Sequence, residues 1–116
     1  MGRFRYQKDE KHYKRLQKEG FLENGCKLCE KLPIKEFQHW RIIPNDFPYT
    51  RIAKLHHMVV LKRHVKEDEL SQEEWMEYNQ LKHSYINDNY EFIIEPTNRK
   101  KSIPAHFHIH LIVAKG

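Results

Sequence analysis

The sequence predicts an α+β domain in which an antiparallel sheet packs against one long helix. Strand-like segments, short and rich in β-forming residues or alternating between polar and apolar, occur at residues 39–43, 56–61, 90–95 and 105–113. Between the second and third of them, residues 71–86 place apolar residues at helical spacing. No internal repeat or low-complexity tract divides the 116 residues, so we expect one core.

The first twenty residues are strongly basic. They contain seven Lys or Arg and three Asp or Glu. Their net charge of +4 is therefore most of the formal net charge of +5 of the whole chain. Residues 8–19 predict a polar helix, and Gly20 is placed to end it. We expect residues 1–25 to form a basic N-terminal extension and residues 26–116 to form the main domain. Two interpretations of the extension stay open, because such a segment either solubilises a helix or contacts nucleic acid.

The long helix carries clear signals at both ends. Ser71 is a candidate N-cap, and Glu74 three residues later completes a capping box. Residues 87–89, Asn-Asp-Asn, end the predicted helix. Between these ends, four residues recur at helical spacing and predict packing against the core: Trp75, Tyr78, Leu81 and Tyr85.

The composition fits a folded, soluble protein. Hydrophobic residues make up 39% of the chain and aromatic residues 12%, which is typical of a globular core. No segment resembles a signal peptide, and no apolar run is long enough to cross a bilayer. We therefore expect a cytoplasmic protein without a membrane partner. In that compartment the C-x-x-C pair Cys26 and Cys29 indicates metal binding or redox chemistry rather than a structural disulfide.

Three histidines alternate with apolar residues in the last predicted strand. Because successive side chains of a strand point to opposite faces, His106, His108 and His110 share one face. The simplest interpretation is a half-buried strand with solvated histidines. Three in one row instead favour phosphate chemistry, since a neutral imidazole attacks phosphorus while neighbouring donors carry the charge on the phosphate oxygens.

The pattern H-φ-H-φ-H-φ-φ at residues 106–112 resembles the motif of the histidine triad (HIT) superfamily of nucleotidyl hydrolases and transferases. Residues 56–64 resemble the superfamily's upstream segment H-φ-φ-φ-φ-P-K-x-H, with Leu61 in place of proline. The resemblance implies a HIT-like fold over residues 26–116. It also implies that His108 is the nucleophile, that His110 binds the α-phosphate and that His56 is a further catalytic histidine. His57 would point to the opposite side of its strand.

The resemblance also suggests residues that bind substrate. Asn45 resembles the polar residue that meets the ribose hydroxyls in the superfamily, although a turn asparagine is an equal alternative. Many relatives have a Gly-rich loop before the triad. Here residues 98–105 contain no glycine, so Ser102 and the neighbouring lysines would bind the phosphates in a different way.

Branches of the HIT superfamily hold zinc with an N-terminal C-x-x-C pair and two histidines. By position, the resemblance implies a zinc site made of Cys26, Cys29, His64 and His106. Four protein ligands would close the coordination shell, so the zinc would be structural rather than catalytic. The alternative is a reduced dithiol without metal, with His64 merely solvated.

Together these patterns predict a nucleotidyl hydrolase or transferase. It would cleave the α-phosphate bond of a nucleoside polyphosphate or phosphoramidate through a covalent nucleotidyl-histidine, and the superfamily implies a homodimer. One alternative is a non-catalytic nucleotide- or RNA-binding module, which the basic extension and the missing Gly-rich loop favour. Another is a metal-dependent enzyme in which two triad histidines, with His56 or His57, hold a catalytic metal.

Overall fold

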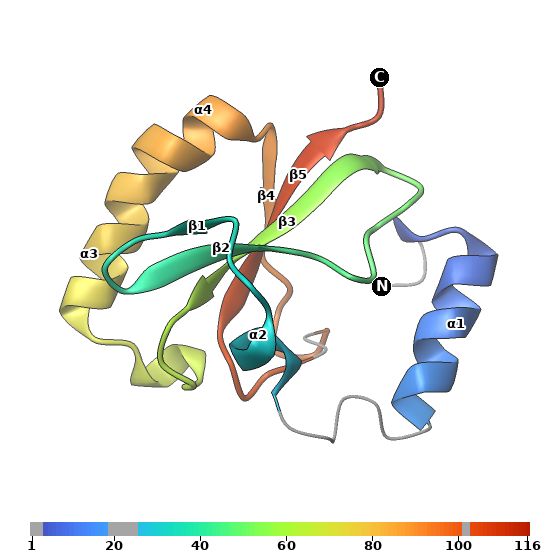
Figure 1. Cartoon of the computed structure of the whole chain (residues 1–116), viewed down its shortest axis with the longest axis horizontal. Helices are drawn as coiled ribbons and strands as arrows, with labels where there is room; N and C mark the ends of the chain where they lie inside the picture. The colour runs from blue at the N-terminus through green and yellow to red at the C-terminus, as the bar shows by residue number, and fades with distance from the viewer. Residues whose placement is uncertain (1–3, 19–25, 101–102) are drawn as a thin grey trace.

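A computed structural model describes residues 4–18, 26–100 and 103–116 of the chain. Its centre is a five-stranded sheet in the order β1-β2-β3-β5-β4, in which all neighbouring strands are antiparallel (Figure 1). The strands are β1 (Lys35–Glu36), β2 (Trp40–Pro44), β3 (Ala53–Leu61), β4 (Phe92–Ile94) and β5 (His108–Ala114). The predicted α+β class with an antiparallel sheet is therefore confirmed.

The last strand, β5, lies inside the sheet between β3 and β4. Met58 of β3 pairs with His110, and Val60 pairs with His108. His56 pairs with Ile112, two residues beyond His110, so its side chain projects from the same face as both histidines. Ile109 and Leu111 on the other face of β5, with Phe107 just before the strand, lie in the main core, as the alternation predicted.

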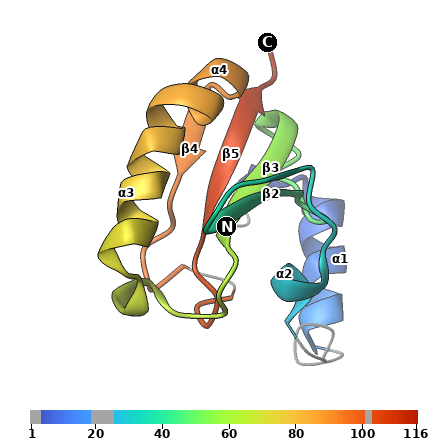
Figure 2. The same ribbon diagram turned by 60° about the vertical axis from the view of Figure 1, so that its left-hand side comes forward.

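The main core lies between the sheet and a continuous helical stretch. This stretch consists of α3 (Gln72–Leu81), the π-helical segment η4 (Lys82–Ile86) and α4 (Asn87–Asn89), and it covers one face of the sheet (Figure 2). The predicted capping box is present, because Glu74 N donates to Ser71 Oγ at 3.2 Å and Ser71 N donates to Glu74 Oε1 at 2.7 Å. The helical stretch continues to Asn89, past the predicted end.

Two helices lie on the opposite side of the sheet, α1 (Gln7–Lys18) and α2 (Lys27–Glu30) (Figure 2). The bounds of α1 agree with the predicted polar helix, but Gly20 lies outside the described residues. Neither α2 nor β1 was predicted. Each depends on contacts from β2, since Arg41 donates to the carbonyls of Lys31 and Leu28, and Ile34 N donates to Ile42 O.

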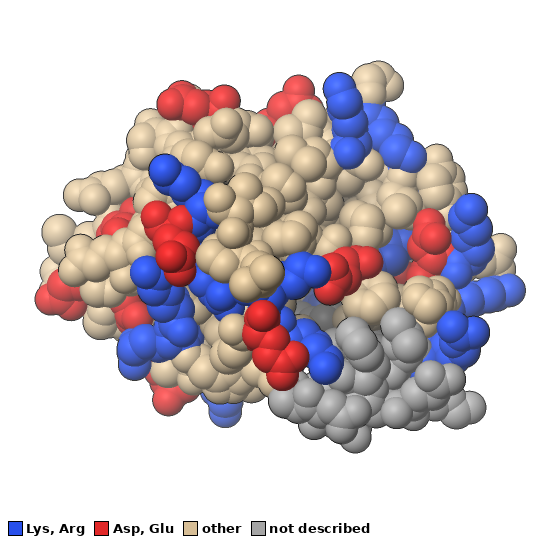
Figure 3. All heavy atoms as spheres, in the orientation of Figure 1, with Lys and Arg blue, Asp and Glu red and all other residues tan. Residues whose placement is uncertain are grey.

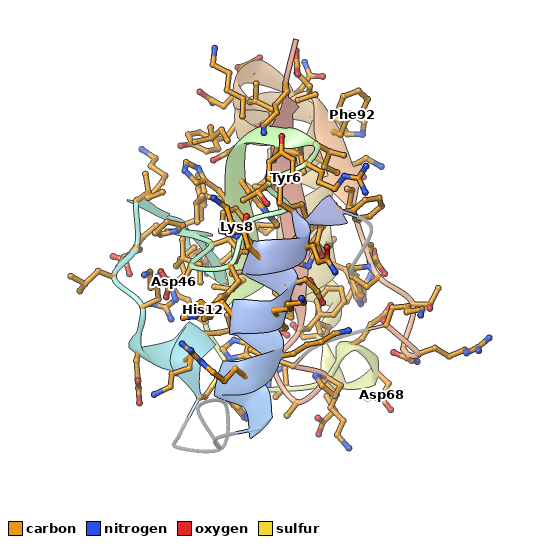
Figure 4. All side chains as sticks on the ribbon, turned by 90° about the vertical axis from the view of Figure 1, so that its right-hand side faces the viewer. Tyr6, Lys8, His12, Asp46, Asp68 and Phe92 are labelled. Carbon is orange, nitrogen blue, oxygen red and sulfur yellow. The ribbon has the colours of Figure 1, made fainter. Side chains whose placement is uncertain are left out.

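The N-terminal segment packs against the loop between β2 and β3. Arg5 Nε donates to Phe47 O at 2.9 Å, and Thr50 Oγ1 donates to Asp9 Oδ2 at 2.7 Å. Figure 4 views α1 from outside, with Lys8 and His12 exposed on it. The predicted domain boundary at residue 25 falls outside the described residues and stays a prediction. None of the described helices is both long and apolar enough to cross a membrane.

Candidate active site and metal centre

His108 lies at the start of β5 with a defined tautomer. Its Nδ1 is 2.9 Å from the backbone carbonyl of His106. A carbonyl oxygen only accepts hydrogen bonds, so Nδ1 must carry the hydrogen. In a neutral ring the lone pair then belongs to Nε2. That is the form a nucleophilic imidazole requires, and His108 also lines a pocket on this side of the sheet.

A second set of contacts joins His56 and His110 to Tyr49. The Tyr49 backbone N–H donates to His56 Nδ1 at 3.0 Å, so His56 carries its hydrogen on Nε2. His56 Nε2 lies 2.8 Å from His110 Nδ1 and donates to it. His110 therefore carries its hydrogen on Nε2, and this group donates to Tyr49 Oη at 3.3 Å. The three side chains form a relay in which the hydrogen of each imidazole has one place.

Asn45 lies directly after β2, beside His56. Its Oδ1 accepts a hydrogen bond from Phe47 N at 2.7 Å, which fixes the orientation of the amide. The amide nitrogen then lies 3.1 Å from His56 Nε2. Both groups are donors, so the acceptor for His56 is the ring of His110 rather than Asn45.

Burial keeps the relay uncharged at neutral pH. Loss of solvation, with a smaller effect of the Arg5 charge, lowers the pKa of His56 to about 3. Loss of solvation, together with the neighbouring His108 and His56, lowers the pKa of His110 to about 2. Burial likewise raises the pKa of Tyr49 to about 12. The relay is therefore neutral throughout, in agreement with the hydrogen positions.

The pocket beside His108 combines cations with an apolar wall. It encloses about 560 Å³, open solvent at its mouth included. Arg5 reaches it from the N-terminal segment, and its guanidinium lies 4.5 Å above the Tyr13 ring. Lys31 forms an ion pair with Asp46, and Asp46 is labelled in the view of Figure 4. The lining consists of Arg5, Tyr13, Lys27, Leu28, Lys31, Ile43, Pro44, Asn45, Asp46, Phe47, Met58, Ile103, His108 and His110.

The four predicted metal ligands lie close together. His106 Nδ1 is 3.3 Å from the sulfur of Cys26 and 3.3 Å from that of Cys29, and His64 Nδ1 is 3.3 Å from the sulfur of Cys29. The four ligand atoms all lie within 4.8 Å of one another. His106 Nε2 donates to Leu61 O at 2.6 Å, which leaves the Nδ1 lone pair facing the sulfurs. This arrangement can hold a metal ion.

The electrostatics of the cluster suit a metal more than reactive thiols. Burial, together with the hydrogen bond to Cys26, raises the pKa of Cys29 to about 11. Without a cation, this thiol keeps its proton at neutral pH, and a bound metal would displace that proton. Burial also lowers the pKa of His106, which keeps the ring in its neutral, ligating form.

A family model described as a protein of unknown function (DUF2851) matches residues 1–115. The chain belongs to DUF2851. The predicted membership of the HIT superfamily is therefore wrong, and no HIT family model matches the DUF2851 chain. The motif misled because a strand in any family places alternate residues on one face, so histidines at this spacing do not by themselves identify the HIT superfamily. No curated protein matches this DUF2851 chain.

In the DUF2851 structure most of the predicted site residues form two groups. Cys26, Cys29, His64 and His106 make the metal cluster, and His56, His108, His110 and Asn45 lie together beside the pocket. Ser102 lies outside the described residues. His57 projects from the opposite face of β3, where its Nδ1 is 2.7 Å from Tyr90 Oη.

Sequence reasoning missed Tyr49 and Arg5. Tyr49 lies in the loop between β2 and β3, just before the turn at residues 50–52, where no periodicity marks it as buried. Arg5 belongs to the basic segment that was predicted to be an N-terminal extension outside the main domain. Arg5 pairs with Glu10, five residues later, at 2.9 Å, a spacing that is not a recognised pairing signal in a sequence.

Proposed function

We propose that this protein is a nucleotidyl hydrolase or transferase that works through a covalent adduct on His108. The substrate would be a nucleoside polyphosphate or phosphoramidate, cleaved at its α-phosphate. The observation that carries this proposal is the tautomer of His108. Its Nδ1–H donates to the His106 carbonyl, so the lone pair of the neutral ring is on Nε2, and the ring lines the pocket. Fixed orientation of a neutral nucleophile is what covalent catalysis by imidazole requires.

The pocket supplies the other parts of such a reaction. When Nε2 bonds to phosphorus, the His108 ring becomes cationic, and its Nδ1–H then donates a charge-assisted hydrogen bond to the His106 carbonyl. Arg5, Lys27 and Lys31 provide positive charge for the phosphate oxygens. An apolar wall made by Leu28, Ile43, Met58 and Ile103 offers a surface for a nucleobase.

His110 and His56 contribute to this proposal by position. The rings of His108 and His110 meet edge to face with centroids 5.3 Å apart, so the relay buttresses the nucleophile. The roles of His110 and His56 in binding or moving protons, and the roles of Asn45 and Ser102 in binding substrate, stay predictions.

We further propose that the metal is zinc with a structural role. Zinc bound to sulfur at about 2.3 Å and to nitrogen at about 2.0–2.1 Å in a tetrahedron separates its ligand atoms by about 3.3–3.8 Å. For a sulfur and a nitrogen ligand the separation is about 3.5–3.6 Å, and the sulfur–nitrogen distances of 3.3 Å lie within about 0.3 Å of it. Two thiolates and two imidazoles would fill the shell, so zinc would supply no reaction step. It would fix His106, whose carbonyl orients His108.

A non-catalytic nucleotide- or RNA-binding module is the second candidate, and one observation favours it. The acids of α1 are engaged by Thr50 and Arg5, whereas its basic side chains are exposed: Lys8, Lys11, Lys14 and Arg15. Against it, acidic and basic groups are interspersed on the face drawn in Figure 3. Nucleic-acid contact through α1 and a homodimer both stay predictions.

Intact-protein mass spectrometry separates these candidates. The wild type, His108→Ala and a control, His83→Ala, which changes an exposed histidine far from the triad in sequence, are incubated with a dinucleoside polyphosphate and with a nucleoside phosphoramidate. A nucleotidyl adduct in the wild type and control, absent from His108→Ala, supports the proposal. Binding without adduct or product favours the module. Adduct formation that a brief chelator treatment abolishes, with folding intact, would favour a catalytic metal.

Metal analysis tests the zinc proposal separately. Cys26→Ser removes one thiolate from a four-ligand site, so the purified variant should hold much less than the one zinc per chain expected of the wild type. An unchanged one-to-one content in the variant would contradict the ligand set.

A further inference from the structure

The short helix α2 contributes side chains both to the metal centre and to the pocket. We propose that the two sites are coupled through α2, so that a metal bound by the four-ligand cluster strengthens the binding of a nucleoside phosphate in the pocket, and the phosphate strengthens the binding of the metal. This inference rests on the proposed function and adds a regulation of the same site, because the affinity of the pocket for its ligand then depends on the metal.

The spacing of residues along α2 separates two sets of side chains. Cys26 and Cys29 lie three positions apart, so they share one side of the turn, and each sulfur is 3.3 Å from His106 Nδ1. Three other residues of the same segment line the pocket: Lys27, Leu28 and Lys31. A single helical turn therefore forms part of the metal centre and part of the pocket wall.

Hydrogen bonds join these two sets of residues into one unit. Within the turn, Cys29 N donates to Cys26 O at 3.2 Å. At the end of the turn, the guanidinium of Arg41 donates to the carbonyl of Lys31 at 2.7 Å and also to the carbonyl of Leu28. Carbonyls at the C-terminal end of a helix have no partner within the helix, so this one side chain holds both of them. A shift of the cysteines would therefore displace the pocket-lining residues with them.

A helix as short as α2 depends on contacts with the rest of the chain. It has four residues, far fewer than an isolated helix needs in water. Its Leu28 is buried against side chains of β2 and β3. A metal bound to the two sulfurs would add an attachment to His106, which is fully buried and whose Nε2 donates to Leu61 O at 2.6 Å. The metal would thus hold α2 in the position that the structure shows.

On the pocket side, α2 supplies two ammonium groups. That of Lys31 pairs with Asp46, which lines the pocket as well. That of Lys27 lies 3.8 Å from the carboxylate of Glu30. A phosphate in the pocket attracts both ammonium groups, so it favours the same position of α2 that the metal favours. Two ligands that favour one state of a shared element strengthen each other's binding.

Linked titrations test this inference. The wild type is prepared with one zinc per chain and without metal, and isothermal titration calorimetry gives the Kd of each form for AMP, GMP, CMP and UMP. We expect the nucleotide that binds best to bind the zinc form about 5- to 150-fold more tightly than the metal-free form. Because coupling of binding free energies is reciprocal, a saturating amount of that nucleotide should strengthen zinc binding by the same factor. Competition with a chromophoric chelator measures zinc binding, and chelator with nucleotide alone is the reference.

Two variants separate coupling through α2 from other effects of the metal. Lys27→Met combined with Lys31→Met removes the ammonium groups of α2, so the zinc form should bind the nucleotide more weakly and the coupling factor should fall toward one. Asn45→Ala changes a pocket residue outside α2, so it should weaken nucleotide binding but keep the coupling factor of the wild type. Coupling that ran through His106 and His108 instead would persist in the lysine variant.

The outcomes distinguish this inference from the proposed function. Equal nucleotide affinity of the zinc and metal-free forms, or an unchanged coupling factor in the lysine variant, would overturn the inference while leaving the His108 adduct intact. Circular dichroism shows whether the metal-free form is folded, and loss of its fold would also overturn the inference, because the coupling would then act through folding of the whole domain. A wild type that binds no zinc would overturn the proposed metal, and a zinc form that binds none of the four nucleotides would overturn the proposed function; this inference would fail with either.

Discussion

Mild acid should destabilise this protein well before its carboxylates are protonated, because the buried pair His56 and His110 has to stay neutral. Burial lowers their pKa values to about 3 and about 2, whereas an unfolded histidine has a pKa near 6.5. Below pH 6.5 these two histidines bind protons in the unfolded chain, whereas in the folded protein they stay neutral. Stability is therefore highest above that pH and falls as the pH decreases toward the folded-state values.

The size of the effect follows from this linkage. Between pH 7 and pH 5, each site whose unfolded pKa is 6.5 and whose folded pKa is far lower costs about 2 kcal/mol of unfolding free energy. Both side chains are more than nine-tenths buried, so little solvent screening reduces this figure. The pair should therefore cost about 4 kcal/mol over two pH units. That is a large share of the roughly 5–15 kcal/mol by which domains are stable.

Urea denaturation at pH 7, 6 and 5 measures this loss. In His56→Gln one titrating group is gone, so the variant starts less stable but should lose about 2 kcal/mol between pH 7 and pH 5. The exposed-site control His83→Gln should keep the full loss. Any loss of stability caused by protonation of the metal ligands is the same in the wild type and in both variants, so it cancels in the comparison. Equal pH dependence in the wild type and His56→Gln, or a measured pKa near 6.5 for His110, would refute the reasoning.

Three further substitutions test the packing around the site by differential scanning calorimetry. Ser71→Ala removes the N-cap acceptor and should cost about 1 kcal/mol, which lowers Tm by about 4 °C; an unchanged Tm would contradict the capping box. Arg5→Met leaves the buried carboxylate of Glu10 without its partner and should cost about 3 kcal/mol, and Arg5→Met combined with Glu10→Gln should recover part of that loss. Tyr90→Phe removes the hydroxyl bonded to His57 and should cost about 1 kcal/mol; a stabilised variant would argue against that bond.

The elements that the sequence predicted are those with local causes. The alternation in residues 105–113 specifies which side chains of β5 enter the main core, and Ser71 with Glu74 specifies where α3 begins. By contrast, β1 and α2 depend on partners from β2, such as Arg41 with the carbonyl of Lys31. Contacts between residues ten or more positions apart leave no periodic signal, so these elements could not be predicted.

In the site, too, some parts could be predicted from the sequence and others could not. The C-x-x-C spacing of Cys26 and Cys29 indicated metal binding or redox chemistry, and the full set with His64 and His106 was implied by the HIT resemblance. The four residues do lie close together and could bind a metal ion. The relay was not predictable, because Tyr49 acts through both its backbone N–H and its hydroxyl, and only the folded turn brings these to two histidines. The family assignment failed because it relied on short strand motifs, whereas the DUF2851 match extends over residues 1–115.

The π-helical segment η4 determines how many residues the chain needs between two core positions of the helical stretch. Leu81 and Ile86 are both buried in the main core although they lie five positions apart in the chain. In a regular α-helix, five residues turn the side chain about 140° away from its starting direction. The wider turn of η4 brings Ile86 back to the sheet. Removing a single residue here would rotate α4 and the approach to β4 out of register, so the number of residues between Leu81 and Ile86 matters as much as their identity.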